Sequence, residues 1–340
     1  MKLDTQIRDF YLPRVAEQAR RFEALGFDGV WSFESAHDPL MPLALAAAAT
    51  KTLEIGTNIV VAFGRSPFAT AIAAWDLQHG SGGRFRLGLG TQVRAHVERR
   101  FSMPFERPAA RAKDYIRCVR AIWNTFQTGA KPEHQGEFYQ FRLINPFFNP
   151  GPLDHPHIPI YLAGVNPTIT RAAGEVADGF HVHPFHSVSY LKEVIRTNLD
   201  EGARTRGKSV HDLDLYAPVF AVTGDTQAEM DRSHAEVRSQ ISFYASTSNY
   251  RAVLEHHGYE ALGDELKLMA RAGEWAAMPE KITDEMVEQF AVVASPAELP
   301  GALRNRYEGL LGRVSLYFPI PEGEPENKWK TFVDAFRAAA

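Results

Sequence analysis

Polar side chains that could exchange protons or bind an anion gather in a few short motifs. Glu34, His37 and Asp38 follow an apolar segment, and a histidine beside an aspartate can serve as an acid–base pair or grip a ligand. The same segment is compatible with a turn and helix cap before Pro39. Arg65 is available for an anion, but it could equally lie on a solvated loop.

Two glycine-containing turns could admit a flat ring or a phosphate. In residues 87–96 (LGLGTQVRAH), Gly88 and Gly90 would let a ligand approach the backbone closely. This is not the GxGxxG dinucleotide fingerprint, because no third glycine follows. His96 could point back toward a site or lie on a helix surface. Residues 162–167 (LAGVNP) lead into a helix, whose free N–H groups would make an anion site.

The histidine-rich segment 181–186 (HVHPFH) raises the possibility of a metal site. His181 and His183 would point to the same side of a strand, as ligands do in some metal-dependent hydrolases. Such sites also need a bridging carboxylate or lysine, so we expect no metal. Cys118 is the single cysteine, which excludes an internal disulfide and a thiolate zinc site. The sequence contains no GxSxG elbow, P-loop or HExxH motif.

The composition is that of an ordinary globular protein. The chain has 340 residues, of which 45% are hydrophobic and 23% charged. A net charge of -4 argues against general binding to nucleic acid or to anionic membranes. No run approaches the ~18 apolar residues of a membrane span, and the N-terminus lacks a signal pattern. We therefore expect a cytoplasmic protein whose partner is a small molecule.

Short apolar segments alternate with helical ones, which is typical of a parallel sheet covered on both sides. The predicted strands are residues 2–5, 29–33, 54–62, 84–90, 157–164, 179–183, 213–222 and 313–318. The predicted helices are residues 13–25, 42–50, 68–78, 109–126, 167–177, 187–205 and 326–338. Eight strands favour a closed (β/α)8 TIM barrel, formed as a single domain over residues 1–340. In such barrels the active site lies at the carboxyl ends of the strands.

Two segments interrupt the alternation. Residues 131–157 are rich in proline, glycine, asparagine and aromatic residues, and we interpret them as an insertion over the mouth of the barrel. Residues 226–290 form an extended helical segment with an irregular patch at 246–262. We expect both to cover the mouth, with Phe138, Tyr139, Phe147 and Phe148 as aromatic walls for a substrate. The alternative is that these rings pack the insertion onto the barrel.

Longer motifs resemble the luciferase-like monooxygenase superfamily, and within it the branch of coenzyme F420-dependent oxidoreductases. The similarity rests on the order and spacing of several pieces rather than on any one of them. The matching motifs are residues 24–31 (ALGFDGVW), 46–59 (AAAATKTLEIGTNI), 65–90 (RSPFATAIAAWDLQHGSGGRFRLGLG), 158–180 (IPIYLAGVNPTITRAAGEVADGF), 241–258 and 282–296.

The resemblance implies an enzyme that transfers a hydride between C5 of the deazaflavin F420 and an unidentified small organic substrate. It also implies a homodimer, and a non-prolyl cis peptide at the end of the third strand, for which Asn58–Ile59 is the best candidate. The positions that match the family's motifs are the predicted cofactor-binding residues, and Arg65 is added because it could bind an anionic group. They are Asn58, Ile59, Val60, Arg65, Gly90, Thr91, His96, Ala163, Gly164, Val165 and Asn166.

The same resemblance places His186 near the substrate, and the interpretation of the insertion adds Phe138 and Tyr139. Val93 stands where some relatives have an acidic glutamate. The candidate proton donors are therefore His37, Glu34 and His96, in that order.

Three alternatives remain open. The first is an FMN-dependent monooxygenase on the same fold, since the two ring systems are nearly isosteric. The second is a non-catalytic F420- or flavin-binding protein, which the missing glutamate would explain. The third is a metal-dependent hydrolase that uses His181 and His183.

Overall fold

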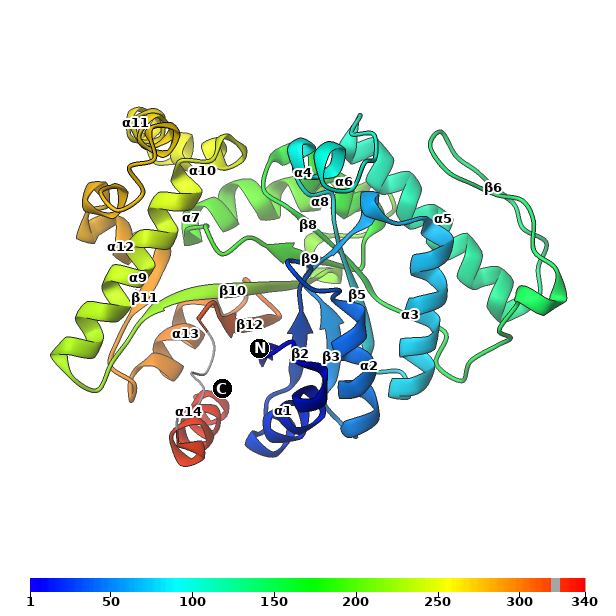
Figure 1. Cartoon of the computed structure of the whole chain (residues 1–340), viewed down its shortest axis with the longest axis horizontal. Coiled ribbons are helices and arrows are strands. Elements are labelled where there is room, and N and C mark those ends of the chain that lie inside the picture. The colour runs from blue at the N-terminus through cyan, green and yellow to red at the C-terminus, as the bar shows by residue number, and fades with distance from the viewer. Residues whose placement is uncertain (319–324, 340) are drawn as a thin grey trace.

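Eight parallel strands form the centre of the molecule. The computed structural model describes residues 1–318 and 325–339. The strands are β1 (Lys2–Gln6), β2 (Gly29–Ser32), β3 (Glu54–Thr57), β5 (Phe85–Gly90), β8 (Ile160–Gly164), β9 (Gly179–Val182), β10 (Asp214–Val222) and β12 (Arg313–Leu316). Each pairs in parallel with the next in this order, and β12 pairs with β1. The sheet therefore closes on itself, and the predicted barrel is confirmed (Figure 1).

Two short strands accompany the barrel. β4 (Val60–Val61) follows a break in the third predicted strand and pairs with β5. β11 (Ala291–Val293) pairs with β10 outside the closed ring, and the sequence did not predict it. The break between β3 and β4 matters most, because it lies at the carboxyl end of the barrel.

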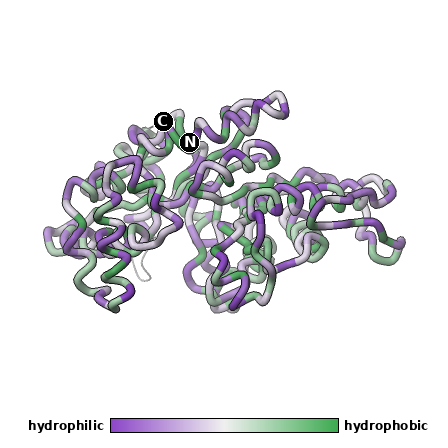
Figure 2. Tube along the Cα trace, turned by 90° about the horizontal axis from the view of Figure 1, so that it is seen from above, coloured by the Kyte–Doolittle hydropathy of each residue, from purple (hydrophilic) through white to green (hydrophobic). Residues whose placement is uncertain are grey.

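Helices surround the strands. They are α1 (Leu12–Leu25), α2 (Leu40–Ala49), α3 (Pro67–Ser81), α4 (Arg94–Arg99), α5 (Pro108–Thr128), α6 (Pro167–Val176), α7 (Val188–Tyr190), η3 (Leu191–Arg196), α8 (Thr197–Arg204), α9 (Gln227–Ala245), α10 (Arg251–His256), α11 (Glu260–Ala272), α12 (Asp284–Phe290), α13 (Leu299–Tyr307) and α14 (Glu326–Ala338). Short helical turns are η1 (Ala62–Gly64), η2 (Pro146–Phe148), η4 (Val210–Asp212), η5 (Ser248–Tyr250) and η6 (Met278–Lys281). Hydrophilic and hydrophobic residues are interspersed along the trace of the chain (Figure 2). In the part of the chain that the structure describes, none of them could cross a membrane.

Side-chain caps fix where two of these helices begin. The Ser66 hydroxyl accepts a hydrogen bond from the N–H of Ala69 at 3.1 Å at the start of α3. The Asn166 side chain accepts one from the N–H of Ile169 at 3.2 Å at the start of α6. Proline follows each cap, where a missing N–H costs no helical bond. The turns between strand and helix are thereby set in place at the mouth.

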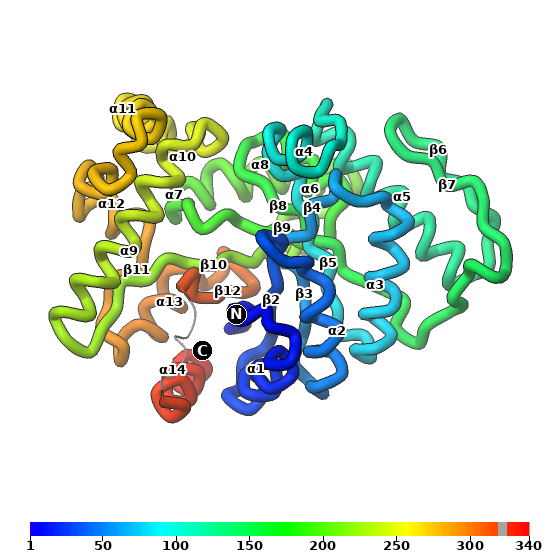
Figure 3. The backbone as a smooth tube through the Cα atoms, in the orientation of Figure 1, coloured from blue at the N-terminus to red at the C-terminus, as the bar shows by residue number. Residues whose placement is uncertain are grey.

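Residues 131–157 do not cover the mouth, contrary to the sequence prediction. They form a hairpin of β6 (His134–Gln135) and β7 (Gln140–Phe141) that packs along the outside of α5. Figures 1 and 3 show this hairpin at the edge of the molecule, away from the strand ends.

Asp114 on α5 holds the hairpin in that place. Its buried carboxylate accepts hydrogen bonds from the N–H groups of Phe138 at 2.7 Å and Tyr139 at 2.9 Å. The same carboxylate contacts Nε2 of His134 at 2.8 Å. The hairpin is thus tied to the outer helix layer and not to the barrel mouth.

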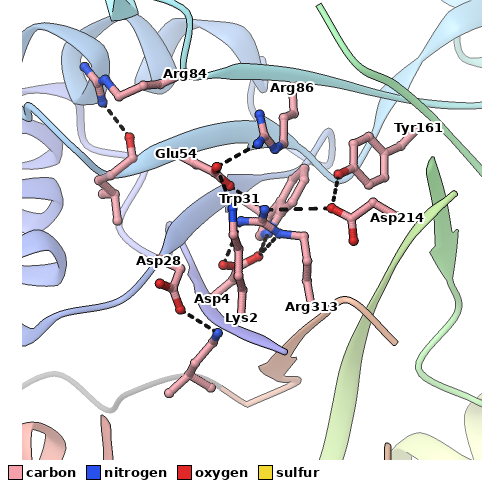
Figure 4. A network of polar contacts seen from close by, with 12 residues as sticks. Lys2, Asp4, Asp28, Trp31, Glu54, Arg84, Arg86, Tyr161, Asp214 and Arg313 are labelled. Atoms are coloured by element: carbon pink, nitrogen blue, oxygen red, sulfur yellow. Dashed lines mark hydrogen bonds and ion pairs between the residues drawn. The ribbon is translucent and has the colours of Figure 1, made fainter. Parts of the chain in front are cut away.

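A polar network fills the barrel at the amino ends of the strands (Figure 4). The buried guanidinium of Arg313 donates two hydrogen bonds to Asp4, at 2.7 and 2.9 Å, and a further one to Glu54. Trp31 also donates to Asp4, at 2.7 Å. Tyr161 donates to Asp214 at 2.6 Å, so six of the eight strands contribute to the network.

Candidate active site

A cavity of about 1050 Å³ lies at the carboxyl ends of the barrel strands. Residues at or just after the carboxyl ends of β1, β2, β3, β5, β8, β9 and β12 line it, together with residues of α9 and η5. Active sites of (β/α)8 barrels lie at this end of the fold. The size is also that of a site for a cofactor together with a small ligand.

Most of the predicted cofactor-binding residues lie together in this cavity. They come from three neighbouring positions in the barrel, at the ends of β3, β5 and β8. The predicted residues that line the cavity are Asn58, Ile59, Gly90, Thr91, Ala163, Gly164, Val165 and Asn166.

The break between β3 and β4 forms one wall of the cavity. The Asn58–Ile59 peptide bond is cis, as the sequence predicted. The N–H of Asn58 donates to the carbonyl of Ser32 at 2.7 Å. Glu34 holds the other side, because its N–H donates to the carbonyl of Ile59 at 3.1 Å and its carboxylate accepts from the N–H of Val61 at 2.7 Å. The wall is therefore fastened to the neighbouring strand β2.

The two glycines of β5 are explained by close packing. A Cβ atom on Gly88 would lie 1.8 Å from the carbonyl oxygen of Thr57 and 2.3 Å from Nε2 of His181. A Cβ atom on Gly90 would lie 2.7 Å from Cδ1 of Ile59. The backbone contact excludes a side chain at Gly88, whereas a side chain at Gly90 would require the Ile59 side chain to move. The Ile59 side chain therefore lies against Gly90, and the two residues form an apolar part of the cavity lining.

The three predicted proton donors do not line this cavity. Glu34 is a positioning residue for the cavity wall, as described above. His37 stacks on Phe10 with ring centroids 5.2 Å apart, in a separate shallow hollow lined by residues 8–13. His96 is exposed on α4. Motif position alone did not show which way these side chains point.

Val60 and Arg65 also lie outside the described lining of the cavity. Val60 is fully buried in β4. Nη2 of Arg65 pairs with Asp38 at 2.6 Å and lies 3.6 Å from Glu34. Two carboxylates thus neutralise the Arg65 guanidinium, which the sequence had predicted to bind an anionic group of a ligand.

Phe138 and Tyr139 pack the insertion onto the helices instead of lining the cavity. The hydroxyl of Tyr139 accepts a hydrogen bond from Nε of Arg111 at 2.8 Å. The ring of Phe138 lies 5.5 Å from the guanidinium carbon of Arg107. The prediction that these two rings contact the substrate is therefore replaced by the packing role, because the hairpin lies on the outside of α5. Phe147 and Phe148, predicted with them, are exposed on η2 and do not belong to the described lining of the cavity either.

The histidines of segment 181–186 have different environments. His181 and His183 line the cavity, whereas His186 is buried behind it and its Nδ1 donates to the carbonyl of His183 at 2.7 Å. Nε2 of His181 donates to the carbonyl of Thr57 at 3.1 Å. Burial lowers the pKa of His181 and of His183 to about 3, and that of His186 to about 4. All three are therefore neutral near pH 7.

The described residues contain no group of three or more side chains that could hold a metal ion. His181 is instead engaged by the backbone of β3, and the ring of His183 packs against two tyrosines. The sequence pattern suggested no role for His181 and His183 other than metal binding.

Several cavity residues were not singled out from the sequence. They are Arg8, Gln240, Tyr244, Asn249, Tyr250 and Tyr317. The irregular patch at 246–262 had been expected near the mouth, and Asn249 and Tyr250 bear this out. The sequence did not predict the cavity residues of α9, because a long polar helix is ordinarily predicted to lie on the protein surface.

The fold and the site define a (β/α)8-barrel enzyme with a ring-sized cavity at its mouth. The chain belongs to the luciferase-like monooxygenase family, whose model matches residues 2–313. Its relatives include reductases and monooxygenases, and the protein is an oxidoreductase.

Individual relatives cover almost the whole chain. An uncharacterized protein of Mycobacterium tuberculosis is 45% identical over 327 residues, which are 96% of each chain. The 5,10-methylenetetrahydromethanopterin reductase of Archaeoglobus fulgidus is 26% identical over 284 residues, 82% of this chain and 81% of the relative. The coenzyme F420-dependent tetrahydromethanopterin reductase of Methanopyrus kandleri has a TM-score of 0.79 at 19% identity, with 99% of this chain and 98% of the other covered.

Proposed function

We propose that this protein uses coenzyme F420 to transfer a hydride to or from a small organic substrate. The observation that carries this proposal is the apolar contact of Ile59 with Gly90 in the lining of a cavity that also includes the turn before α6. Two similar solved structures are named as F420-dependent enzymes, which supports this choice of cofactor.

The described residues fit a deazaflavin in three ways. The side chain of Ile59 offers a face on which a planar ring can lie. Gly90 and Thr91 leave open space beside that face. Residues 163–166 precede the first turn of α6, whose free N–H groups favour a negatively charged group. The bound deazaflavin would supply the hydride-accepting carbon, and the chain would position it and keep one face free for substrate.

Position 93 is a valine, where some relatives have an acidic glutamate. The protein would therefore act mainly by positioning the cofactor and the substrate. No aspartate, glutamate or lysine is among the described residues that line the cavity. His183, whose ring is neutral, is the residue of the lining best suited to donate an N–H hydrogen bond to a substrate. We assign it, and not Glu34, His37 or His96, to contact with the substrate.

Cofactor titration tests the proposal directly. Purified protein is titrated with F420 and, separately, with FMN, and binding is followed by the quenching of ligand fluorescence. We expect F420 to bind at micromolar concentration and more tightly than FMN. Binding of FMN without F420 would instead favour the flavin-dependent monooxygenase, and binding of neither would refute both.

A substitution in the cavity wall locates the bound ring. Ile59→Ala removes the apolar face and is expected to weaken F420 binding about 10-fold, from the loss of buried apolar contact. Ile72→Ala on α3 is the matched control, because Ile72 is partly buried outside the cavity. Equal weakening in both variants would show that the ring does not lie on Ile59.

We also propose that the protein is a homodimer that pairs through α2. The sequence of this helix, LMPLALAAAA, contains no charged residue. Met41 and Leu45 on it are exposed, at 58% and 37%. A helix that is apolar all round is ordinarily buried. We therefore infer that a second copy of the chain packs against the exposed face of α2.

A further inference from the structure

The cavity has two sides that come from different strands. One follows β3, β5 and β8 and contains the residues proposed to hold the deazaflavin. The other follows β9, β10, β12 and β1, which are consecutive neighbours in the barrel, and residues of α9 and η5 complete it. We call this second side the substrate side. It is defined by Arg8, His183, Gln240, Tyr244, Tyr250 and Tyr317.

Arg8 is the cation of the substrate side. Its Nη2 donates to the backbone carbonyl of Tyr317 at 3.0 Å, and Arg8 forms no ion pair with any described residue. The other charged side chain in the described lining, Arg107, belongs to the start of α5 and pairs with Glu137. Within the described chain, the substrate side thus presents a positive charge without a carboxylate, although the whole protein is acidic.

His183 presents a second donor with a fixed orientation. The N–H of Phe185 donates to Nδ1 of His183 at 3.1 Å, so Nδ1 carries no proton. The proton of the neutral ring is therefore on Nε2, for which no partner exists among the described residues. The ring is held between Tyr244 and Tyr250, with centroids 4.6 and 4.3 Å away. His183 lines the cavity and is not fully buried, so this N–H can reach a ligand.

The hydroxyl groups of two tyrosines on the substrate side, Tyr244 and Tyr317, are hydrogen-bonded within that side. The hydroxyl oxygens of Tyr244 and Tyr317 are 2.8 Å apart, and Tyr317 donates to Oε1 of Gln240 at 3.2 Å. Burial raises the pKa of Tyr244 and raises that of Tyr250 to about 12, so neither becomes an anion near neutral pH. Their rings therefore act as flat walls, and the charge and the free N–H come from Arg8 and His183.

We propose that the substrate side binds an organic carboxylate that also carries a carbonyl oxygen. The carboxylate pairs with the guanidinium of Arg8, the carbonyl oxygen accepts the Nε2–H of His183, and the planar body lies against the tyrosine rings. This inference rests on the proposed function, because it takes the opposite side of the cavity to be the cofactor's. It assigns a substrate class and two recognition residues.

Calorimetric titration of the protein with two probes tests the carboxylate. Phenylglyoxylate has a carboxylate beside a ketone on an aromatic ring, and phenylglyoxylamide is its neutral counterpart. We expect the protein to bind phenylglyoxylate about 10-fold more tightly or better, as is usual for a charge-assisted hydrogen bond. Equal affinities, or binding of neither probe at millimolar concentration, would overturn the proposal.

Substitutions assign the effect to the named residues. Arg8→Gln keeps a hydrogen-bonding side chain but loses the charge, and it is expected to make the two probes equal. Arg107→Gln, the matched control on the other side of the cavity, is expected to retain the preference for phenylglyoxylate. Loss of the preference in Arg107→Gln alone would place the anion on the cofactor side and refute the assignment.

His183 is tested with the ketone. His183→Phe keeps a ring between the two tyrosines but lacks the N–H. The wild-type protein should bind phenylglyoxylate more tightly than phenylacetate, which has no ketone, and the variant should not distinguish them. Circular dichroism and the F420 titration of each variant show whether the fold and the cofactor side are intact, and a variant that still distinguishes the two ligands contradicts the role of His183.

The F420 titration also separates the two hypotheses. If F420 binds while the carboxylate preference is absent, the proposed function stands and the substrate class is wrong. If the Arg8-dependent preference is present while F420 does not bind, the anion site stands and the proposed cofactor is wrong.

Discussion

The pairing of Arg313 with Asp4 is the most buried ionic contact of the described chain, at side-chain exposures of 1% and 0%. Arg313→Met should destabilise the protein by about 3–5 kcal/mol, because it leaves the Asp4 carboxylate buried without its cation. The free energy of unfolding can be measured by urea denaturation followed by circular dichroism.

Two further variants test this explanation. The double variant Asp4→Asn with Arg313→Met removes both charges and should regain part of the lost stability. Arg94→Met breaks an exposed pair with Glu98 on α4 and should change stability by less than about 1 kcal/mol. A double variant less stable than Arg313→Met alone would contradict the role of the uncompensated charge.

The buried histidines make stability depend on pH. In the folded state burial holds the pKa of His181 at about 3 and that of His186 at about 4, below the ordinary value of 6.5. The unfolded chain therefore takes up protons first as the pH falls. Stability is full above about pH 6.5 and declines between there and pH 4, by up to about 1.4 kcal/mol per pH unit for each histidine.

His186→Asn tests this dependence, because asparagine can keep the hydrogen bond to the carbonyl of His183. The variant should show a shallower decline of unfolding free energy between pH 6.5 and pH 4 than the wild-type protein. The exposed His211→Asn on η4 should keep the wild-type slope. If both variants have the same slope, burial of His186 is not the cause.

At the scale of single residues, the sequence predicted positions better than side-chain directions. Residues such as Ile59, Gly90 and Thr91 were placed correctly, because the backbone at a strand end must face the mouth. Glu34 and His37 both follow β2. The Glu34 side chain hydrogen-bonds within the cavity wall, however, and the His37 ring stacks on Phe10. Such directions depend on contacts with other strands, which spacing along the chain does not contain.

At the scale of elements, the carboxylate of Asp114 is expected to determine where the β6–β7 hairpin lies. Asp114→Ala removes the acceptor for two backbone N–H groups and the contact with His134. Limited proteolysis should then cut residues 131–157 faster, while F420 affinity stays unchanged because this hairpin contributes no residue to the described cavity lining. Asp154→Ala, an exposed change in the same insertion, is the control and should leave the cutting rate unchanged.

The location of that hairpin shows what composition can and cannot predict. Proline, glycine and aromatic residues correctly indicated an interruption of the barrel pattern between 131 and 157. They did not indicate which end or side of the barrel the interruption would lie on. That is decided by Asp114, a buried acid within α5 that helical periodicity alone would treat as a surface residue.

The strands and their order were the most predictable part of the whole molecule. Most strands are short apolar runs bounded by turn residues, and the parallel arrangement follows from the helices between them. The closure of the ring depends on the pairing of β12 with β1, whose residues are about 310 positions apart. From the sequence, closure was favoured by the strand count and implied by the family resemblance, and not by any local pattern.

The homodimer is a prediction for the whole molecule. Leu45→Glu places a charge in the apolar face of α2 and should convert a dimer into a monomer, because burying an unpaired carboxylate at an interface is costly. Light scattering coupled to size-exclusion chromatography measures the mass in solution. Leu268→Glu is the matched control, since Leu268 is an exposed leucine at 64% on α11 and should leave the mass unchanged. A wild-type protein that elutes as a monomer, or a dimer that only Leu268→Glu disrupts, would show that α2 is not the face through which two copies pair.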